Sequence, residues 1–396
     1  MSKTVIHVTA SLSPRGSGVF RAVLGLASAQ GAAGHRVTVV GQRDKDTDGP
    51  LHLPPLTCKL KSKRVLGPQR LGFSPSLAVE LASLSAHADI LHGHGLWMFP
   101  NWVAGWIARY RRRPLVVAPH GCLDPWALAA PSWQKRLAWK LFDQRNLASA
   151  ACLQALCPQE ITAFRRLGLM APIALLPNGV NLGEYGRLPR RRVFEEAFPS
   201  AHGRKIILFL SRLHPKKGLL PLVQAWGRIR PKYPDWLLVL AGPDETGHRS
   251  AVEQAAQEAG ASPGLLFTGP LQGTLKLAAF GAAEFLVLPS FSEGFPLVLL
   301  EALACRLPLL ITPQCNFTEA VEAGAGFFID SPTPQATEIG LELMLSLSSE
   351  ELRAMGDKGR QLVERHYTWD RVAQKSGELY RWLLGEASPP PFVFLN

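Results

Sequence analysis

Short apolar segments alternate with longer amphipathic segments along this chain, and this alternation constrains the fold more than any other feature. Strands that alternate with helices form a parallel sheet, because a parallel connection needs a crossover long enough to hold a helix. The alternation stops at residues 181–204 and begins again at Lys205. The sequence therefore predicts an α/β protein with two doubly wound, Rossmann-like domains. The expected strands are 5–10, 37–40, 90–92, 115–118, 151–155 and 173–176, and then 205–210, 237–241, 265–268, 285–288 and 309–311.

A chain of 396 residues is long enough for two domains of ordinary size. We expect a first domain at 1–180, a linker at 181–204, a second domain at 205–366, and a closing helix with a loose tail at 367–396. The linker is predicted from its charged and irregular composition. The loose tail is predicted from three consecutive prolines at 389–391, which cannot continue a regular helix.

Composition excludes several classes of protein. Apolar residues make up 47% of the chain, yet no run of about 18 of them offers a membrane-spanning helix. The first ten residues read as a strand and not as the apolar core of a signal peptide. The six cysteines lack zinc-ligand spacing, since Cys152 and Cys157 are five residues apart. We expect a protein of the reducing cytosol.

The positive charge is concentrated in the first half of the chain. Residues 1–186 hold 21 Lys and Arg against 9 Asp and Glu, a net of +12, whereas residues 187–396 hold 22 of each. Tryptophans lie among the basic residues at 102–113 and 133–140, a combination suited to an anionic membrane surface. A solvated basic helix face explains the pattern equally well. Nucleic acid is a weaker alternative, because no aromatic-rich RNA motif or recognition helix is present.

The stretch from Ser290 to Glu301 carries the strongest functional signal. Glu293 follows the apolar strand at 284–289, and Glu301 lies in a helix expected from Leu297 to Leu303, where we expect it to face outward. One interpretation is a helix cap followed by a solvated glutamate. The other is a pair of carboxylates that accept hydrogen bonds from the hydroxyls of a ligand.

The start of this helix is also suited to phosphate. Pro296 fits the first turn, and Ser292 or Glu293 is placed to cap it. The amides of Gly294 and Phe295 then point along the helix axis, where a helix N-terminus attracts anions. A phosphate site flanked by hydroxyl acceptors predicts a nucleotide sugar as ligand.

Arg212 and Lys217 agree with this interpretation. They follow the apolar strand at 205–210 and precede a helix at 219–230, so they lie where open α/β sheets bind ligands. Arginine offers a planar fork to phosphate oxygens, and lysine offers a mobile point charge. The alternative is an exposed basic turn.

Loops rich in glycine and histidine follow strands of the first half. Gly16 and Gly18 open a helix, although Arg21 breaks the dinucleotide-binding pattern, so an ordinary tight turn is an equal alternative. His94 and His120 each end a strand-to-loop segment, and two such loops at one sheet edge favour a cleft function over a purely structural one.

Two further segments of the first half contain candidate site residues. Asp124 and Trp126 follow the second histidine loop and are placed to line an acceptor pocket. The acidic run Asp44–Asp48 has the spacing of a metal-binding Asp-x-Asp, but a solvated loop explains it better because no other site feature adjoins it.

These motifs together resemble those of retaining glycosyltransferases with two Rossmann-like domains facing a central cleft, the GT-B enzymes of family 4 or glycosyl transferases group 1. The resemblance spans most of the chain, and Glu-x7-Glu with the Arg and Lys pair is its specific part. The family's first loop often reads Gly-Gly, whereas Ser17 separates the glycines here. The motifs are the Gly16/Gly18 loop, His92-x-His94-Gly, Pro119-His120-Gly, Pro177-Asn178-Gly-Val, Ser211-Arg-Leu with Lys217-Gly, and Pro289-Ser-x-x-Glu293-Gly-Phe-Pro with Glu301-Ala.

The resemblance implies a role for each site residue. His120 and Glu293 would act at the reacting sugar, His120 by contact near the reacting centre and Glu293 by binding a donor-sugar hydroxyl. The donor would also be held by Gly16, Gly18, Arg212 and Lys217 at the diphosphate, by Gly294, Phe295 and Pro296 along sugar and phosphate, and by Glu301 at the ribose. The acceptor would meet His94, Asp124 and Trp126.

The implied activity is transfer of a hexose from a nucleotide diphosphate sugar to a saccharide acceptor, polyprenyl-linked, in cell-surface polysaccharide or lipopolysaccharide biosynthesis. The enzyme would be cytoplasmic and peripheral on the inner face of the membrane. No metal cofactor is expected, because the family usually needs none and Arg212 and Lys217 supply positive charge. Two alternatives stay open, a sugar-nucleotide epimerase of the same architecture and a non-catalytic protein that binds an anionic polymer or membrane.

Overall fold

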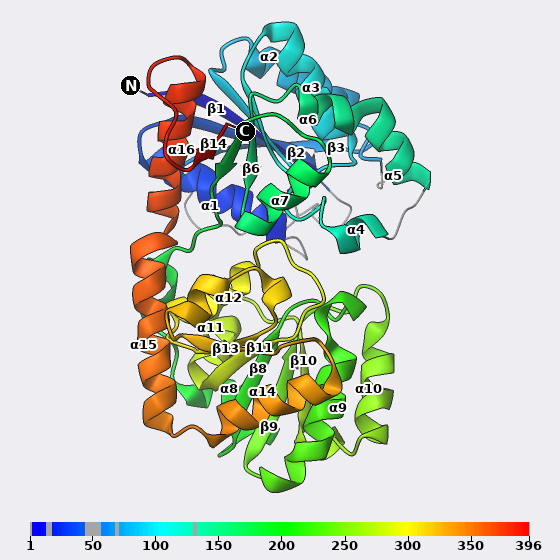
Figure 1. Ribbon diagram of the computed structural model, residues 1–396, viewed down its shortest axis with the longest axis vertical. Helices are drawn as coiled ribbons and strands as arrows, with labels where there is room; N and C mark the ends of the chain where they lie inside the picture. Colours follow the sequence, from blue (N-terminus) through cyan, green and yellow to red (C-terminus); the bar gives the residue numbers. More distant parts are fainter. Residues whose placement is uncertain (1, 13–17, 44–56, 68–70, 130–132, 396) are drawn as a thin grey trace. The chain divides into compact units, whose positions relative to one another are not determined.

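The computed structural model describes residues 2–12, 18–43, 57–67, 71–129 and 133–395. Two compact units divide the chain: residues 1–179 with 369–396, and residues 180–368 (Figure 1). Each is built on a parallel sheet with helices on both faces, which confirms the predicted fold class. None of the helices among the described residues is long and apolar enough to cross a bilayer.

An eight-stranded sheet forms the centre of the first unit, in the order β14-β7-β6-β5-β4-β1-β2-β3. Its strands are parallel except β14, which pairs antiparallel with β7. The strands are β1 Thr4–Thr9, β2 Arg36–Arg43, β3 Lys59–Arg64, β4 Ile90–His94, β5 Leu115–Ala118, β6 Cys152–Ala155, β7 Ile173–Leu175 and β14 Val393–Phe394. The helices are α1 Gly18–Ala32, α2 Pro75–Ser85, α3 Phe99–Arg111, α4 Pro125–Ala129, α5 Trp133–Ala138, the π-helix η2 Trp139–Asp143, α6 Gln144–Ala148, α7 Pro158–Arg166 and α16 Trp369–Leu383.

Successive residues of β1 point to opposite faces of this sheet, as strand geometry requires. Val5 packs in one apolar cluster with Phe20 of α1 and Tyr380 of α16. Ile6 packs in the other with Leu77 of α2 and residues of α3. The central strands are therefore buried on both sides, which explains their continuous apolar sequence.

The second unit has a six-stranded, all-parallel sheet in the order β10-β9-β8-β11-β12-β13. Its strands are β8 Lys205–Leu210, β9 Trp236–Ala241, β10 Leu265–Gly269, β11 Ala283–Leu288, β12 Leu309–Ile311 and β13 Gly326–Phe328. Its α-helices are α8 Arg191–Ala197, α9 Leu219–Ile229, α10 His248–Glu258, α11 Gly273–Ala282, α12 Leu297–Ala304, α13 Thr318–Glu322, α14 Pro334–Ser346 and α15 Ser349–His366. Short 3-10 turns are η3 Leu182–Tyr185, η4 Pro199–Ala201, η5 Pro215–Lys217, η6 Arg230–Lys232, η7 Ser262–Gly264 and η8 Pro313–Cys315.

The segment expected as a linker is instead a folded part of the second unit. Residues 181–204 hold η3, α8 and η4, and their Tyr185 and Phe194 side chains are buried. A short amphipathic helix with one aromatic anchor gives too weak a periodic signal to be recognised in a charged segment.

The chain end also differs from the expectation. The tail is not loose, because Val393 and Phe394 pair with Ala174 and Ile173 of β7. The last helix, α16, belongs to the first unit, and its Trp369 ring leaves no room for a side chain at Gly25, where a Cβ would lie 2.2 Å from it. The closing helix and tail therefore complete the sheet and one helical layer of the first unit (Figure 1).

Candidate functional site

Two loops at the carboxyl ends of neighbouring strands build the candidate site of the second unit. β8 pairs with β11, so the loop after Leu210 lies beside the loop after Leu288. The amide of Phe291 donates to the carbonyl of Lys216 at 2.8 Å. Gly218 has φ +69°, and a Cβ there would lie 2.0 Å from the Pro289 carbonyl oxygen. Only glycine fits this close approach, which holds the two loops together.

Lys217 and Glu293 form a buried ion pair across these loops. Nζ lies 2.5 Å from Oε1, and the two side chains are 10% and 9% exposed. The Ser290 hydroxyl donates to the same Oε1 at 2.7 Å. Since a carboxylate carries about four acceptor sites, Glu293 keeps acceptor capacity for a ligand hydroxyl beside a fixed ammonium group.

Glu301 forms the second buried ion pair of the unit. Its Oε2 accepts from Lys276 Nζ at 2.6 Å, and its Oε1 accepts from the Tyr185 hydroxyl at 3.0 Å. The expectation that Glu301 faces outward is wrong, because the residue is 8% exposed. Burial and the neighbouring carboxylate raise the pKa of Tyr185, so its hydroxyl stays protonated and donates.

The start of α12 differs in detail from the prediction. Pro296 is the N-cap residue and makes no side-chain cap, so neither Ser292 nor Glu293 occupies the expected N-cap position. The segment that leads into the helix is held by a residue from another loop. The side-chain amide of Asn316 donates to the carbonyls of Glu293 and Gly294 at 2.7 and 3.0 Å.

Phe295 is an anchor of this approach. Its side chain is 7% exposed and packs against Phe317 and Tyr367. Because the side chain is buried, Phe295 can contact a ligand only through its backbone, and the backbone amide is the group expected from the sequence to make this contact.

Arg212 lies at the same sheet edge but in a more open position. Its side chain is 44% exposed and its Nη1 lies 3.2 Å from Glu245 Oε2. An exposed pair of this kind is worth at most about 1 kcal/mol. Arg212 can therefore exchange Glu245 for a ligand phosphate at little cost.

In the first unit, His120 lies at the carboxyl end of β5 in the left-handed region, with φ 53°. Glu160 fixes the following turn, since its two oxygens accept from the amides of Gly121 at 2.6 Å and Leu156 at 2.7 Å. Burial raises the pKa of Glu160 to about 7. A strained, non-glycine residue held by a buried carboxylate is typical of a functional position.

Asp124 and Trp126 follow this turn at the start of α4. The Asp124 carboxylate accepts from the Trp126 amide at 2.8 Å, and the Trp126 side chain is 41% exposed. Their predicted contact with an acceptor stays a prediction.

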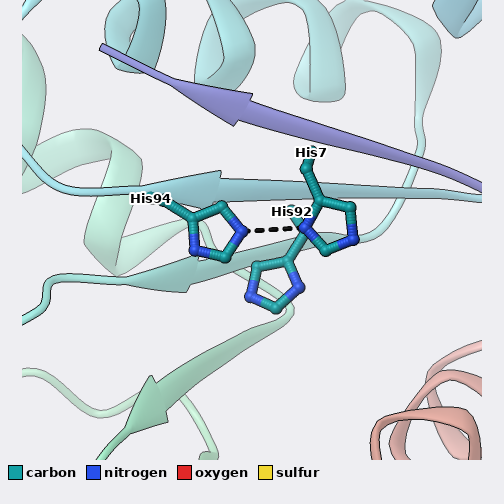
Figure 2. Close-up of side chains that lie close together, drawn as sticks. All are labelled: His7, His92 and His94. Atoms are coloured by element: carbon teal, nitrogen blue, oxygen red, sulfur yellow. Dashed lines mark hydrogen bonds between the residues drawn. The ribbon is translucent and has the colours of Figure 1, made fainter. Parts of the chain in front are cut away.

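His94 is buried and joined to two other histidines. Its Nδ1 lies 3.0 Å from His120 Nε2, and its Nε2 lies 2.8 Å from His7 Nδ1. Figure 2 shows His94 and His7 joined in this way, with His92 packed against both. Because both ring nitrogens of His94 are occupied, we expect it to act through His120 and not by direct contact with an acceptor.

Among the described residues, His7, His92 and His94 form one group with the close spacing of metal ligands, since one nitrogen of each ring lies within 4.8 Å of one nitrogen of the other two. Burial lowers the pKa of His7 and His120 to about 4, and those of His92 and His94 also lie well below the ordinary value. All four rings are therefore neutral at pH 7.

The predicted glycine loop is described only in part. Gly16 and the acidic run Asp44–Asp48 lie outside the described residues. Gly18 is the first residue of α1, and a Cβ there would meet nothing within 4 Å.

With this geometry in place, the two halves of the chain match two family models. Residues 17–179 match the glycosyl transferase 4-like domain, and residues 191–362 match the glycosyl transferases group 1. The chain belongs to the group 1 glycosyltransferases. The chain thus has the GT-B fold, and the family predicted from its motifs is confirmed.

Individual relatives agree with this assignment. A D-inositol 3-phosphate glycosyltransferase of Corynebacterium urealyticum is 33% identical over 185 residues, 45% of this chain and 43% of that protein, so the enzyme spans less than half of its length. The GDP-mannose:cellobiosyl-diphosphopolyprenol alpha-mannosyltransferase of Xanthomonas campestris is 24% identical over 96% of this chain and 97% of that protein. The structure of Anabaena Alr3699/HepE in complex with UDP and glucose superposes with a TM-score of 0.77, 17% identity, and coverage of 95% and 99% of the two chains.

Sequence reasoning missed several residues of the glycosyltransferase site. Lys276 and Tyr185 complete the Glu301 cluster, and Ser290 and Asn316 hold the Glu293 loop. Ser290 was visible within the motif, next to the strand end. The others lie 22 to 116 residues from the group they contact, and no local pattern marks them.

Proposed function

We propose that this glycosyltransferase moves a hexose, with retention of configuration, from a nucleotide diphosphate sugar to a lipid-linked saccharide in cell-surface polysaccharide or lipopolysaccharide assembly. The observation that carries the proposal is the presence of two buried Lys–Glu pairs, Lys217–Glu293 and Lys276–Glu301, in the unit that holds the Glu-x7-Glu motif. Buried charges are costly unless a function or a partner maintains them. Carboxylates fixed by ammonium groups suit the hydroxyls of a sugar and a ribose.

Each residue then has a chemical task. Arg212, Lys217 and the first amides of α12 stabilise the charge that develops on the departing diphosphate, at about 3–4 kcal/mol for a well-placed donor. The bond from the sugar carbon to phosphate breaks while the acceptor oxygen attacks the same face. The departing phosphate oxygen takes the acceptor proton. No metal is required in this scheme.

A direct test measures products with donor alone and with donor plus acceptor. Transfer that depends on acceptor, with an anomer of unchanged configuration by NMR, supports the proposal. Conversion of the donor to another sugar nucleotide without acceptor would instead establish an epimerase. Activity should persist in EDTA, and loss of activity that Mg²⁺ or Mn²⁺ restores would refute the metal-free scheme.

Arg212 offers a sharper test of donor binding. Arg212→Ala should lower kcat/KM at least about tenfold, from one lost charge-assisted contact of about 1.5–3 kcal/mol. Arg228→Ala is a matched control, since Arg228 is 48% exposed and pairs with Glu338 on the surface. Equal kinetics of both variants would remove Arg212 from the donor site.

The lipid-linked acceptor is proposed from an exposed face of the first unit. Trp102, Trp106 and Tyr110 are four residues apart along α3 and so share one helix face. Trp102 stacks on Phe142 of η2 at 4.2 Å, and Trp106 stacks on Tyr110 at 5.7 Å. Trp106 and Tyr110 are 59% and 71% exposed. An apolar strip of this kind is unusual on a surface that meets only water.

Basic side chains accompany this strip. Arg111, Arg112, Arg136 and Lys140 are exposed, and the Arg111 guanidinium lies over the Tyr110 ring. We refer to Trp106, Tyr110 and these four residues as the aromatic–basic face. It suits an anionic bilayer, where each Lys or Arg near the surface adds about 1 kcal/mol.

Liposome co-sedimentation tests this face. The enzyme should bind anionic vesicles at low salt and release at high salt, since exposed charges are screened. Charge reversal at Arg111, Arg112, Arg136 and Lys140 should abolish binding and leave donor affinity unchanged. Equal, negligible binding to anionic and neutral vesicles would favour a soluble acceptor and a merely solvated helix face.

A further inference from the structure

Three neutral histidines and one glutamine form a continuous polar path through the apolar interior of the first unit. His7 of β1, His94 of β4 and His120 after β5 lie on neighbouring strands. His7 Nε2 lies 2.7 Å from Gln30 Oε1, and the Gln30 amide group contacts Ser376 Oγ at 2.8 Å and the Tyr380 hydroxyl at 3.0 Å. The path therefore runs from α16, near the chain end, to the turn at His120.

The direction of the first bond is fixed by Ser376. A serine hydroxyl has one proton, and Ser376 donates it to the Ala373 carbonyl at 2.8 Å. Its contact with Gln30 must therefore be one that it accepts, so the NH2 group of Gln30 faces Ser376. The carbonyl oxygen of Gln30 then faces His7, and His7 carries its proton on Nε2.

The protons of the other rings follow from this assignment. A neutral imidazole has one donor and one acceptor nitrogen. His7 Nδ1 accepts, so His94 donates from Nε2 at 2.8 Å. His94 Nδ1 then accepts, so His120 donates from Nε2 at 3.0 Å. His120 Nδ1 is left as an acceptor, and the described residues offer it no hydrogen bond.

We infer that Gln30 is a positioning residue that holds His120 in its Nε2–H tautomer through His7 and His94, so that His120 Nδ1 accepts a hydrogen bond from a sugar hydroxyl. This inference rests on the proposed function for the contact of His120 with the sugar. It goes beyond that function in assigning Gln30, Ser376 and the histidine chain a part in selecting a hydroxyl group at this contact.

The same histidines could be considered as a metal site, but their geometry favours the chain. His7 Nδ1 and His94 Nε2 share one proton at 2.8 Å, whereas a metal needs a lone pair from each. The rings of His7, His92 and His94 are stacked on one another, with interplanar angles of 20–29° (Figure 2).

Gln30→Met tests the inference, with Gln154→Met as its control. Both glutamines are buried at similar exposure, 0% and 3%. Gln154 donates to the Leu176 carbonyl and interacts with His92, which is not a member of the His7–His94–His120 chain. Long-range ¹H–¹⁵N spectra of the histidine side chains report which ring nitrogen carries the proton. Wild type and Gln154→Met should show one His120 signal set, of the Nε2–H type, and Gln30→Met should add an Nδ1–H set.

Kinetics give an independent readout. In Gln30→Met, kcat/KM should fall roughly two- to threefold, because only the Nε2–H fraction of His120 accepts from the sugar. Gln30→Glu should keep the wild-type tautomer, since a carboxylate can only accept from His7. If Gln30→Met does not fold, the double variant Ser376→Ala/Tyr380→Phe releases the glutamine amide and should give the same mixed spectrum.

An unchanged His120 tautomer in Gln30→Met, or in the double variant, would overturn the inference. So would stoichiometric binding of added Zn²⁺ with loss of the shared N–H signals of His7 and His94, which would establish a metal site. The spectra do not depend on turnover. A failure of the proposed function would appear as absent sugar transfer with the tautomer result intact.

Discussion

Replacing Lys217 by methionine separates the structural role of the Lys217–Glu293 pair from its role with the donor. The two side chains are 10% and 9% exposed, with Nζ 2.5 Å from Oε1. Loss of the ammonium leaves a buried carboxylate that keeps the Ser290 hydroxyl as donor. Removing one partner of a buried pair costs about 3–5 kcal/mol, and we expect the free energy of unfolding to fall by that amount.

The double variant Lys217→Met/Glu293→Gln removes both charges and nearly keeps their volumes. It should regain stability to within about 1 kcal/mol of wild type, since replacing a whole buried pair is often neutral. Its kcat/KM should stay low, because neither the phosphate cation nor the hydroxyl acceptor is restored. Urea unfolding and steady-state kinetics on the same preparations measure both effects.

The exposed pair Arg212–Glu245 is the matched control for stability. Its side chains are 44% and 46% exposed, so Arg212→Met should cost at most about 1 kcal/mol. If Lys217→Met is as stable as wild type, or if the double variant is no more stable than the single one, the pair is not the buried contact described. Recovery of kcat/KM in the double variant would refute its part in catalysis.

Three further predictions concern other residues. Glu301→Gln should raise the donor Kd at least about tenfold by calorimetry, through about 1.5–3 kcal/mol of lost charge-assisted bonding. A 2′,3′-dideoxyribose donor should lose this difference if the ribose is the partner. Glu160→Gln should lower the free energy of unfolding by about 1–3 kcal/mol and reduce kcat. The glutamine side chain has one acceptor oxygen, so it can accept from only one of the Gly121 and Leu156 backbone amides. Equal unfolding midpoints of the variant and wild type would contradict this. Burial lowers the pKa of His7 from 6.5 to about 4 in the folded protein. Wild type should therefore lose about 3 kcal/mol of stability relative to His7→Phe as pH falls across this range, and parallel pH–stability curves would show that His7 is not buried and neutral.

The sequence was sufficient for the central strands of both sheets because these strands are buried on both faces. Continuous apolar runs such as 206–210 and 285–288 are typical of core strands in an alternating pattern, and both lie in strands of the second unit. β3, Lys59–Arg64, was missed because it is an edge strand, and edges are commonly charged.

The site was predictable where the chemistry lies on one strand-to-helix segment. Lys217, Glu293 and Glu301 lie in segments that follow apolar strands, so their positions in the sequence predict that they lie at the carboxyl edge of the sheet. The burial and the bonding partners of these three side chains were not predictable. The prediction that Glu301 faces outward is wrong. Its carboxylate is buried against Tyr185, which lies 116 residues away in the sequence.

A common physical cause underlies what the sequence could not show in either unit. A buried charge or a neutral histidine must be satisfied by a partner, but any residue that the fold brings near can be that partner. Lys276 is the partner of Glu301, and Gln30 contacts both His7 and Ser376, the second of which lies 346 residues further along the sequence. The last helix therefore does more than cover the first sheet, because its Ser376 hydroxyl fixes the direction of a hydrogen-bond chain that ends at the predicted catalytic histidine.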